Sequence, residues 1–275
     1  MAEAENSDDK IIFLGTGGAR FMVAHQVLAS GGIWLRLSGK NLLLDPGPGC
    51  IVQVNKRGLA PETLDAVILS HRHLDHSGDT NVMIEAMTDG GFRGHGEFFA
   101  PADAFGPEPV IFSYLRRFLS RVTVLAEGGR YDLDGLKFET PLRHRHPVDT
   151  FGLVFHSDGR SLAYITDSRY FDELSRAYRA DLLIINVVLT EPRPTIDHLT
   201  LKDAENIIAD VRPKAAILTH FGMNVWRARP AEAAAQMTER TGIPVIAAQD
   251  GMTLNPATLD DPAGIRASIK ITGAE

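Results

Sequence analysis

The densest cluster of metal-ligand residue types in this chain is Ser70-His71-Arg72-His73-Leu74-Asp75-His76. It follows directly on the apolar run of residues 66–69, which is typical of a buried strand. On a turn that leaves a strand, side chains two positions apart point the same way. His71 and His73 can therefore bind one ion while Asp75 and His76 face a second. A chance polar loop is a poor explanation, since the chain has only 10 histidines in 275 residues. Imidazole together with carboxylate favours zinc or a similar divalent metal.

Outward from this cluster, short β-type runs alternate with helical patterns, and no low-complexity linker interrupts them. This alternation predicts a single α/β domain over residues 11–275, preceded by a flexible tail over residues 1–10. Both halves of the chain repeat the order strand, strand, helix, buried strand and then histidine. Two similar β-sheets packed face to face, with helices outside, would satisfy this order.

The predicted strands are residues 11–14, 33–37, 42–44, 66–69, 97–100, 122–125, 136–139, 151–155, 161–165, 182–188, 215–219 and 245–247. The predicted helices are residues 51–56, 80–87, 110–119, 201–211 and 231–240. The helix at 201–211 is the best marked, because Thr200 can cap it and Asp203 completes a capping box. The run Gly15-Thr16-Gly17-Gly18 lacks a third spaced glycine and a following helix, so we expect a tight turn rather than a dinucleotide-binding loop.

Composition excludes several classes of protein. The chain has 28 Lys and Arg against 35 Asp and Glu, a net charge of −7, and no basic run, which disfavours a long nucleic acid as partner. It contains no stretch of 18 apolar residues, and its acidic start, MAEAENSDDK, is unlike a signal peptide. The single cysteine, Cys50, excludes an internal disulfide. We therefore expect a cytoplasmic protein without membrane contact.

A lone cluster does not complete a two-metal site, but further residues of the same types follow later strands. Asp167 and His220 each come directly after a strand-like segment. His144 and His146 stand just ahead of another, and either can serve as a ligand. Side chains at strand ends can reach a common cleft, so these residues are candidates to complete the site.

In this order, the motifs resemble the metallo-β-lactamase-fold hydrolases, and within them the RNase Z-like branch. The resemblance spans residues 11–222. It is carried by Leu14-Gly15-Thr16-Gly17-Gly18, Leu44-Asp45-Pro46-Gly47-Pro48-Gly49, the cluster of residues 71–76, His146 ahead of Phe151-Gly152, Thr166-Asp167 and Leu218-Thr219-His220-Phe221. It implies an α/β fold of the αββα four-layer sandwich type, with a metal centre at one edge between the sheets.

The resemblance also implies two divalent ions, with zinc as the first candidate and manganese or iron as alternatives. The implied ligands are His71, His73 and His146 for one ion, Asp75, His76 and His220 for the other, and Asp167 as a bridge between both. Asp45 would orient the histidines rather than bind metal. His146 is preferred to His144, because its spacing to Phe151-Gly152 fits the family pattern better.

Two divalent ions activate water for attack on a phosphoryl or carbonyl centre, so the predicted reaction is a hydrolysis. The redox branch of the family usually has Glu in place of His73, and true β-lactamases have a zinc-binding cysteine where Asp167 stands. We assign catalysis to Asp75 and His198. The latter resembles the RNase Z-like histidine that assists departure of the leaving oxygen, since Thr200 follows two residues later.

The predicted substrate is a small or short phosphodiester. Only 21 positions separate His146 from Asp167, which leaves no room for the long arm that grips tRNA. Asn186-Val187-Val188 also replaces an expected His-Glu-Ala triplet, for which Glu191 is a weak substitute. A tRNA 3′-processing endonuclease is therefore disfavoured. A thioester or lactone hydrolase that does not need His198 is the main alternative, and a scaffold without activity is another. Aromatic residues at 110–119 would cover the cleft, form a homodimer face or pack in the core.

Overall fold

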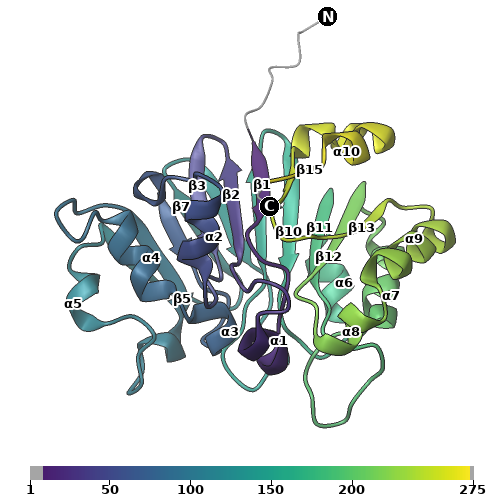
Figure 1. Cartoon of the computed structure of the whole chain (residues 1–275), viewed down its shortest axis with the longest axis horizontal. Helices are drawn as coiled ribbons and strands as arrows, with labels where there is room; N and C mark the ends of the chain where they lie inside the picture. Colours follow the sequence, from purple (N-terminus) through teal and green to yellow (C-terminus); the bar gives the residue numbers. More distant parts are fainter. Residues whose placement is uncertain (1–8, 273–275) are drawn as a thin grey trace, which may run out of the picture.

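The computed structural model describes residues 9–272 and places two β-sheets face to face between outer helices (Figure 1). The first sheet has the order β15-β14-β1-β2-β3-β4-β5-β6, and the second β13-β12-β11-β10-β9-β8-β7. The first contains β1 (Lys10–Phe13), β2 (Ile33–Leu37), β3 (Lys40–Leu44), β4 (Ala66–Ile68), β5 (Glu97–Pro101), β6 (Arg121–Leu125), β14 (Met252–Leu254) and β15 (Lys270–Ile271). The second contains β7 (Gly129–Leu133), β8 (Leu136–Thr140), β9 (Leu153–Ser157), β10 (Arg160–Ile165), β11 (Leu182–Asn186), β12 (Ala215–Thr219) and β13 (Val245–Ala247).

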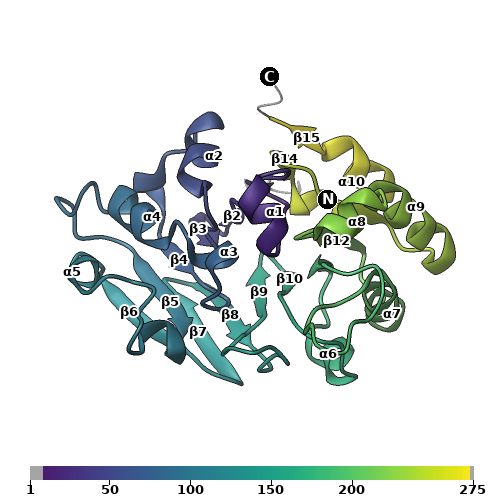
Figure 2. The same cartoon turned by 60° about the horizontal axis from the view of Figure 1, so that its bottom comes forward.

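Helices lie outside the sheets and along their edges. They are α1 (Arg20–His25), α2 (Cys50–Lys56), α3 (Leu74–Ser77), α4 (Thr80–Met87), α5 (Ser113–Arg116), α6 (Glu173–Ala177), α7 (Leu201–Val211), α8 (Met223–Arg227), α9 (Pro230–Thr241) and α10 (Pro262–Ser268). Figure 2 shows α2 and α4 outside the first sheet and α7 and α9 outside the second. The predicted αββα sandwich is confirmed.

Strand β4 illustrates why the central strands are apolar throughout. Its side chains alternate between two faces: Ala66 and Ile68 lie in the core between the sheets, whereas Val67 packs in the core with Cys50 and Met83 from α2 and α4. A strand buried on both faces has a continuous apolar run rather than an alternating one. Burial of each large aliphatic side chain contributes roughly 1.5–3 kcal/mol, so the layers hold together through their apolar strands.

The carboxyl ends of the parallel strands open at one edge of the sandwich. Strands β3 and β4 run parallel in one sheet, and β10, β11 and β12 run parallel in the other. Backbone hydrogen bonds join the sheets there: Phe221 N donates to Thr16 O at 2.7 Å, Gly18 N donates to Phe221 O at 3.1 Å, and Phe151 N donates to Ser70 O at 3.1 Å. Helices α1, α3 and α8 lie at this edge, at the bottom of Figure 1. Ligands generally bind at such carboxyl ends of strands.

The predicted helix over residues 110–119 is helical only at α5. The amide of Asn81 explains the difference, because it donates to Val110 O at 2.8 Å and accepts from Phe112 N at 2.9 Å. These bonds hold residues 110–112 extended, with Phe112 at φ −61° and ψ 139°. Phe112 and Tyr114 are about half-exposed and stack on each other, while Leu115 is buried. A homodimer stays a prediction.

Several elements appear where the sequence analysis did not place them: β7, β14, β15, α1, α3, α6, α8 and α10. Strand β7 pairs with β8 through the turn Asp134-Gly135, where both residues have positive φ as a two-residue hairpin requires. Helix α1 opens directly after the glycine-rich turn that was expected to lack a helix, and it is anchored by the fully buried Met22. By contrast, α7 has the predicted bounds, and its Thr200–Asp203 capping box is present.

The described chain begins earlier than the predicted domain. Residues 1–8 of the predicted tail lie outside the described residues. Asp9 is buried, and its carboxylate accepts from Ser38 N at 2.9 Å and from Ser157 Oγ at 2.8 Å. Strand β1 then starts at Lys10, so the end of the predicted tail belongs to the fold. Within residues 9–272, no helix is long and apolar enough to cross a membrane.

Candidate metal centre

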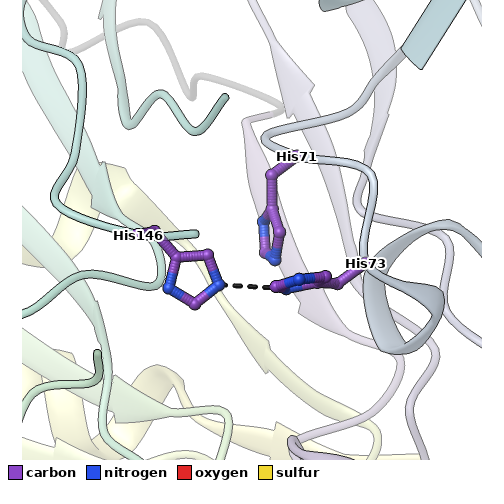
Figure 3. Close-up of side chains that lie close together, drawn as sticks. All are labelled: His71, His73 and His146. Atoms are coloured by element: carbon purple, nitrogen blue, oxygen red, sulfur yellow. Dashed lines mark hydrogen bonds between the residues drawn. The ribbon is translucent and has the colours of Figure 1, made fainter. Parts of the chain in front are cut away.

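Three histidines converge from two loops at the open edge (Figure 3). His71 and His73 follow β4, and His146 lies between β8 and β9. One nitrogen of each lies within 4.8 Å of the others, and His146 Nε2 is 3.0 Å from His73 Nδ1. Because His146 Nδ1 donates to Asp197 O at 2.9 Å, its Nε2 keeps a lone pair directed toward the other two rings.

A second group lies beside the first and contains Asp75, His76, Asp167 and His220, again with ligand atoms within 4.8 Å of one another. Asp167 Oδ2 is 3.3 Å from His76 Nε2, and its Oδ1 is 3.4 Å from His220 Nδ1. Asp167 Oδ2 also lies 3.9 Å from His71 Nε2 of the first group. Its carboxylate therefore stands between the two groups, and the structure brings together all seven predicted ligand residues.

The donor set passes a direct test of fit to divalent ions. Among residues 9–272, the buried atoms His71 Nε2, His198 Nδ1, His220 Nδ1 and His220 Nε2 have no hydrogen-bond partner. Buried polar atoms are nearly always paired, so four such nitrogens at one place call for another partner. The surrounding carboxylate oxygens lie 3.4–3.9 Å away. Nitrogen and oxygen donors at this spacing fit borderline divalent metals.

Asp45 at the end of β3 fixes two of the histidine tautomers. Its Oδ2 accepts from Ser70 Oγ at 2.7 Å, from His76 Nδ1 at 2.9 Å and from Tyr164 OH at 2.9 Å. A carboxylate can only accept, so His76 carries a proton on Nδ1, and its Nε2, 3.3 Å from Asp167 Oδ2, is the nitrogen that could bind a metal. Ser70 Oγ, having donated to Asp45, accepts from His71 Nδ1 at 3.0 Å. Asp45 thus orients the histidines, as the sequence analysis expected.

Burial and charge set the protonation of these groups. Burial and the neighbouring imidazoles lower the pKa of His71 well below its usual value, so its ring stays neutral. Burial also lowers the pKa of His146, to about 4. Burial would raise the pKa of Asp75, but the nearby imidazoles of His76 and His220 outweigh it and lower that pKa. Burial would lower the pKa of His76, but the carboxylates around it raise that pKa well above its usual value, so a cation bound at Nε2 would displace a proton. Neutral imidazoles and ionised carboxylates are the forms that bind a cation.

A match to a protein-family model shows to which superfamily this chain is related. The model of the β-lactamase superfamily domain matches residues 40–221. The chain belongs to the β-lactamase superfamily. Among curated relatives, the uncharacterised protein MJ1374 of Methanocaldococcus jannaschii is 30% identical over 252 residues, which cover 88% of this chain and 93% of that protein. The probable metallo-hydrolase YhfI of Bacillus subtilis is 28% identical over 77% of this chain and 86% of its own.

Solved structures of the superfamily share this fold. The metallo-β-lactamase-fold protein YhfI from Bacillus subtilis superposes with a TM-score of 0.74 at 21% identity, over 89% of this chain and 98% of that one. A diphosphatase of the PhnP family superposes with a TM-score of 0.66 at 20% identity, over 90% of this chain and 96% of that one.

Ribonucleases Z are among the curated sequence relatives. A ribonuclease Z from Mycobacterium bovis is 24% identical over 78% of this chain and 82% of that protein. The predicted resemblance to RNase Z-like superfamily members is confirmed.

His144 lies outside both groups of the superfamily site. Its Nδ1 donates to Asp167 O at 3.2 Å, and its Nε2 accepts from Tyr178 OH at 2.7 Å. Both ring nitrogens are therefore engaged, and burial lowers the pKa of His144 to about 4. This histidine braces the backbone of Asp167, whereas His146 faces His73. The geometry favours His146, as the spacing predicted.

His144→Ala is accordingly expected to retain metal, whereas His146→Ala loses it. Loss of the His144 ring removes a buried partner of Tyr178, so the free energy of unfolding should fall by about 1–3 kcal/mol. Metal analysis of both purified variants, with melting curves, checks this pair. Metal loss in His144→Ala together with retention in His146→Ala would reverse the assignment.

Asn186 is a site residue that the sequence analysis noted only as a departure from the family triplet. Its Nδ2 donates to Asp167 Oδ1 at 3.0 Å and to Tyr164 OH at 3.2 Å. Tyr164 in turn donates to Asp45. One amide thus couples the carboxylate between the two groups to the carboxylate that orients His76. Its position at the end of β11 was the available signal, since the neighbouring strand ends also carry site residues.

The glycine-rich turn passes close to the second ligand group. A Cβ on Gly18 would lie 2.1 Å from His220 Nδ1, so only glycine lets the turn pass this ring. The next residue, Ala19, donates its N–H to Asp75 Oδ2 at 2.9 Å. The turn therefore supports two members of the second group, in line with the expected approach of backbone to the cleft.

His198 lies at the mouth of the site. Its Nδ1 is 3.4 Å from Asp167 Oδ2, and its ring centroid is 5.2 Å from that of His146. The side chain is 15% exposed, so one edge of the ring reaches solvent. Just after it, Thr200 caps α7, as predicted. His198 is thus adjacent to both groups while remaining accessible to a substrate.

Proposed function

We propose that this protein is a hydrolase that uses two divalent metal ions to cleave a small or short phosphodiester. The observation that carries the proposal is the pair of adjacent ligand groups with Asp167 between them and His198 beside it. One ion would be held by His71, His73 and His146, and the other by Asp75, His76 and His220, with Asp167 shared. Zinc is our first assignment, and manganese or iron are alternatives.

Such ions, when bound, lower the pKa of a water and stabilise negative charge on an attacked phosphoryl centre. The chain's own residues supply orientation and proton transfer. Asp45 and Asn186 hold His76 and Asp167 in place, and the Ala19 N–H does the same for Asp75. The bond from Ala19 fixes the orientation of the Asp75 carboxylate, which we assign to catalysis beside the reacting atoms. His198 would donate a proton to the leaving oxygen.

A short substrate fits the chain better than precursor tRNA does. The segment between His146 and Asp167 consists of a short connection, residues 147–152, followed by β9, a tight turn at Asp158-Gly159 and β10. No arm projects between these two residues. The names of a ribonuclease Z and a diphosphatase among the relatives and structural neighbours agree with phosphoester chemistry as a class.

Activity on a panel of esters tests the proposal. Protein loaded with zinc or manganese is assayed on bis(p-nitrophenyl) phosphate, a dinucleotide, an acyl thioester and a lactone. We expect turnover of the two phosphodiesters above that of the other esters. Faster turnover of the thioester or lactone would replace the proposal by that alternative, and no turnover of any substrate by fully loaded protein would favour an inactive scaffold.

Two metal ions per chain are expected, because seven ligand side chains exceed what one tetrahedral ion can use. Elemental analysis of purified, undialysed protein, repeated after addition of zinc or manganese, measures the ratio. A reproducible value near one that does not rise on addition would contradict the dinuclear site.

Precursor tRNA is expected to be processed poorly compared with a dinucleotide, with a shallow salt dependence of whatever binding occurs. No arm projects between His146 and Asp167, and the chain has a negative net charge. Initial rates on both substrates at several salt concentrations check this expectation. Efficient and accurate release of a 3′ trailer would contradict it.

A further inference from the structure

The loop between β11 and α7, residues 187–200, brings two groups to the metal centre. Its base is closed by backbone bonds, from Val188 N to Leu199 O at 3.3 Å and from Leu201 N to Leu189 O at 3.1 Å. Residues 191–195 are exposed. The far side of the loop carries the Asp197 carbonyl that binds His146 Nδ1, and next to it His198. The position of this loop therefore affects both residues.

The side chain of Arg169 forms hydrogen bonds to this loop. Its Nε donates to Asp197 Oδ1 at 2.7 Å, and its Nη2 approaches the same oxygen at 2.6 Å. Nη2 also donates to Pro194 O at 2.6 Å. Charge-assisted bonds of a planar guanidinium impose direction as well as attraction. Two points of the loop, three residues apart, are thus tied to one side chain.

The backbone of Arg169 is itself hydrogen-bonded to the segment that carries His146. Its N–H donates to Arg145 O at 2.9 Å, and the preceding Ser168 Oγ accepts from Arg145 N at 3.2 Å. Arg169 stands two residues after Asp167. It therefore joins three parts of the site: the end of β10, the segment before β9 and the loop before α7.

We propose that Arg169 is a positioning residue, which through Asp197 holds His146 toward the first ligand group and His198 beside Asp167. Arg169 does not touch either group itself. Its ion pair is half-exposed, with side-chain exposures of 48% for Arg169 and 29% for Asp197, and pairs of this kind contribute little to stability. Loss of Arg169 should therefore affect the site much more than the fold. The part that concerns His198 rests on the proposed function.

Two single variants and their combination test the proposal. Arg169→Gln removes the guanidinium, and Asp197→Ala removes the carboxylate but keeps the backbone carbonyl used by His146. Arg143→Gln is the matched control, because it breaks an Arg–Asp pair with Asp149 of similar exposure, 56% and 29%, on the same segment as His146. Arg169→Lys asks whether charge without the planar fork suffices.

We expect zinc affinity, measured by competition with a chelator, to fall by about 10–100-fold in Arg169→Gln and in Asp197→Ala. At saturating metal, kcat on a dinucleotide should fall by a similar factor with little change in KM. The double variant should be no worse than Arg169→Gln alone, since both substitutions break the link between Arg169 and Asp197. Arg169→Lys should recover part of the loss, and melting temperatures should stay close to that of Arg143→Gln.

Zinc affinity needs no substrate, so this arm remains informative even if no phosphodiester is cleaved. Unchanged zinc affinity in both single variants would overturn the link to His146. Additive losses in the double variant, or losses matched by Arg143→Gln, would overturn the proposed role of the pair. A failure of the proposed function alone would appear as wild-type protein that binds zinc but cleaves no phosphodiester.

Discussion

Asp167→Ala is expected to bind less metal and to lose almost all turnover. The carboxylate lies between the two ligand groups, 3.9 Å from His71 of the first and 3.4 Å from His220 of the second, so its removal would take a ligand from both. Metal ions contribute several kcal/mol to transition-state stabilisation, and each 1.36 kcal/mol corresponds to about tenfold in rate. We therefore expect kcat to fall on the order of 10³-fold or more. Metal analysis and initial rates on bis(p-nitrophenyl) phosphate measure both effects.

Asp167→Asn separates charge from volume at this position. It keeps the size of the side chain and an oxygen for the Asn186 amide, but it lacks the negative charge that a cation requires. It should lose metal nearly as strongly as the alanine variant while remaining folded. Asp172→Asn, at an exposed carboxylate ahead of α6, is the control and should behave like the wild type. Full metal content and near-normal turnover in Asp167→Ala would show that Asp167 is not a metal ligand.

His198→Ala is expected to keep both metals and to lose activity according to the leaving group. An imidazole that donates a proton typically contributes about 10²–10⁴-fold. A nucleoside alkoxide needs this proton, whereas p-nitrophenolate is a good leaving group without it. The loss in kcat should therefore be large on a dinucleotide and much smaller on an aryl phosphodiester. Parallel rate measurements on both substrates, with metal analysis, provide the test.

His156→Ala serves as the matched control for His198. His156 lies in β9 with a half-exposed side chain beside Glu139, and it belongs to neither ligand group. Its substitution should leave both rates unchanged. Equal losses on the two substrates in His198→Ala, with full metal occupancy, would show that His198 does not protonate the leaving group. The thioester or lactone alternative would then be favoured.

Local patterns in the sequence were sufficient to predict much of the sandwich. The apolar runs at β4 and β12 are long enough to be buried on both faces, and α7 carries its own capping box at Thr200. The histidine-rich run after β4 shows its ligand types within seven residues. The order of later motifs, read as a resemblance, extended this set to His146, Asp167 and His220. The strands, the capped helix and the histidine-rich run depend on neighbours in the chain, so the sequence alone could determine them, whereas the three later residues were implied by the resemblance.

Other features depend on contacts between distant segments, and only the tertiary structure could decide them. His144 and His146 have the same side chain two positions apart, and what distinguishes them is that Tyr178 lies against one and His73 against the other. Asn186 acquires its role from Asp167, which reaches it because β10 and β11 are adjacent.

The same reason explains the shortened α5 and the loop held by Arg169. An amide from α4 keeps residues 110–112 extended against their helical propensity, and Arg169 meets Asp197 across 28 positions of sequence. Propensity and spacing describe what a segment favours on its own. A hydrogen bond between segments forms only when the packing of the two sheets places a donor within about 3 Å of its acceptor, and no local pattern encodes that distance.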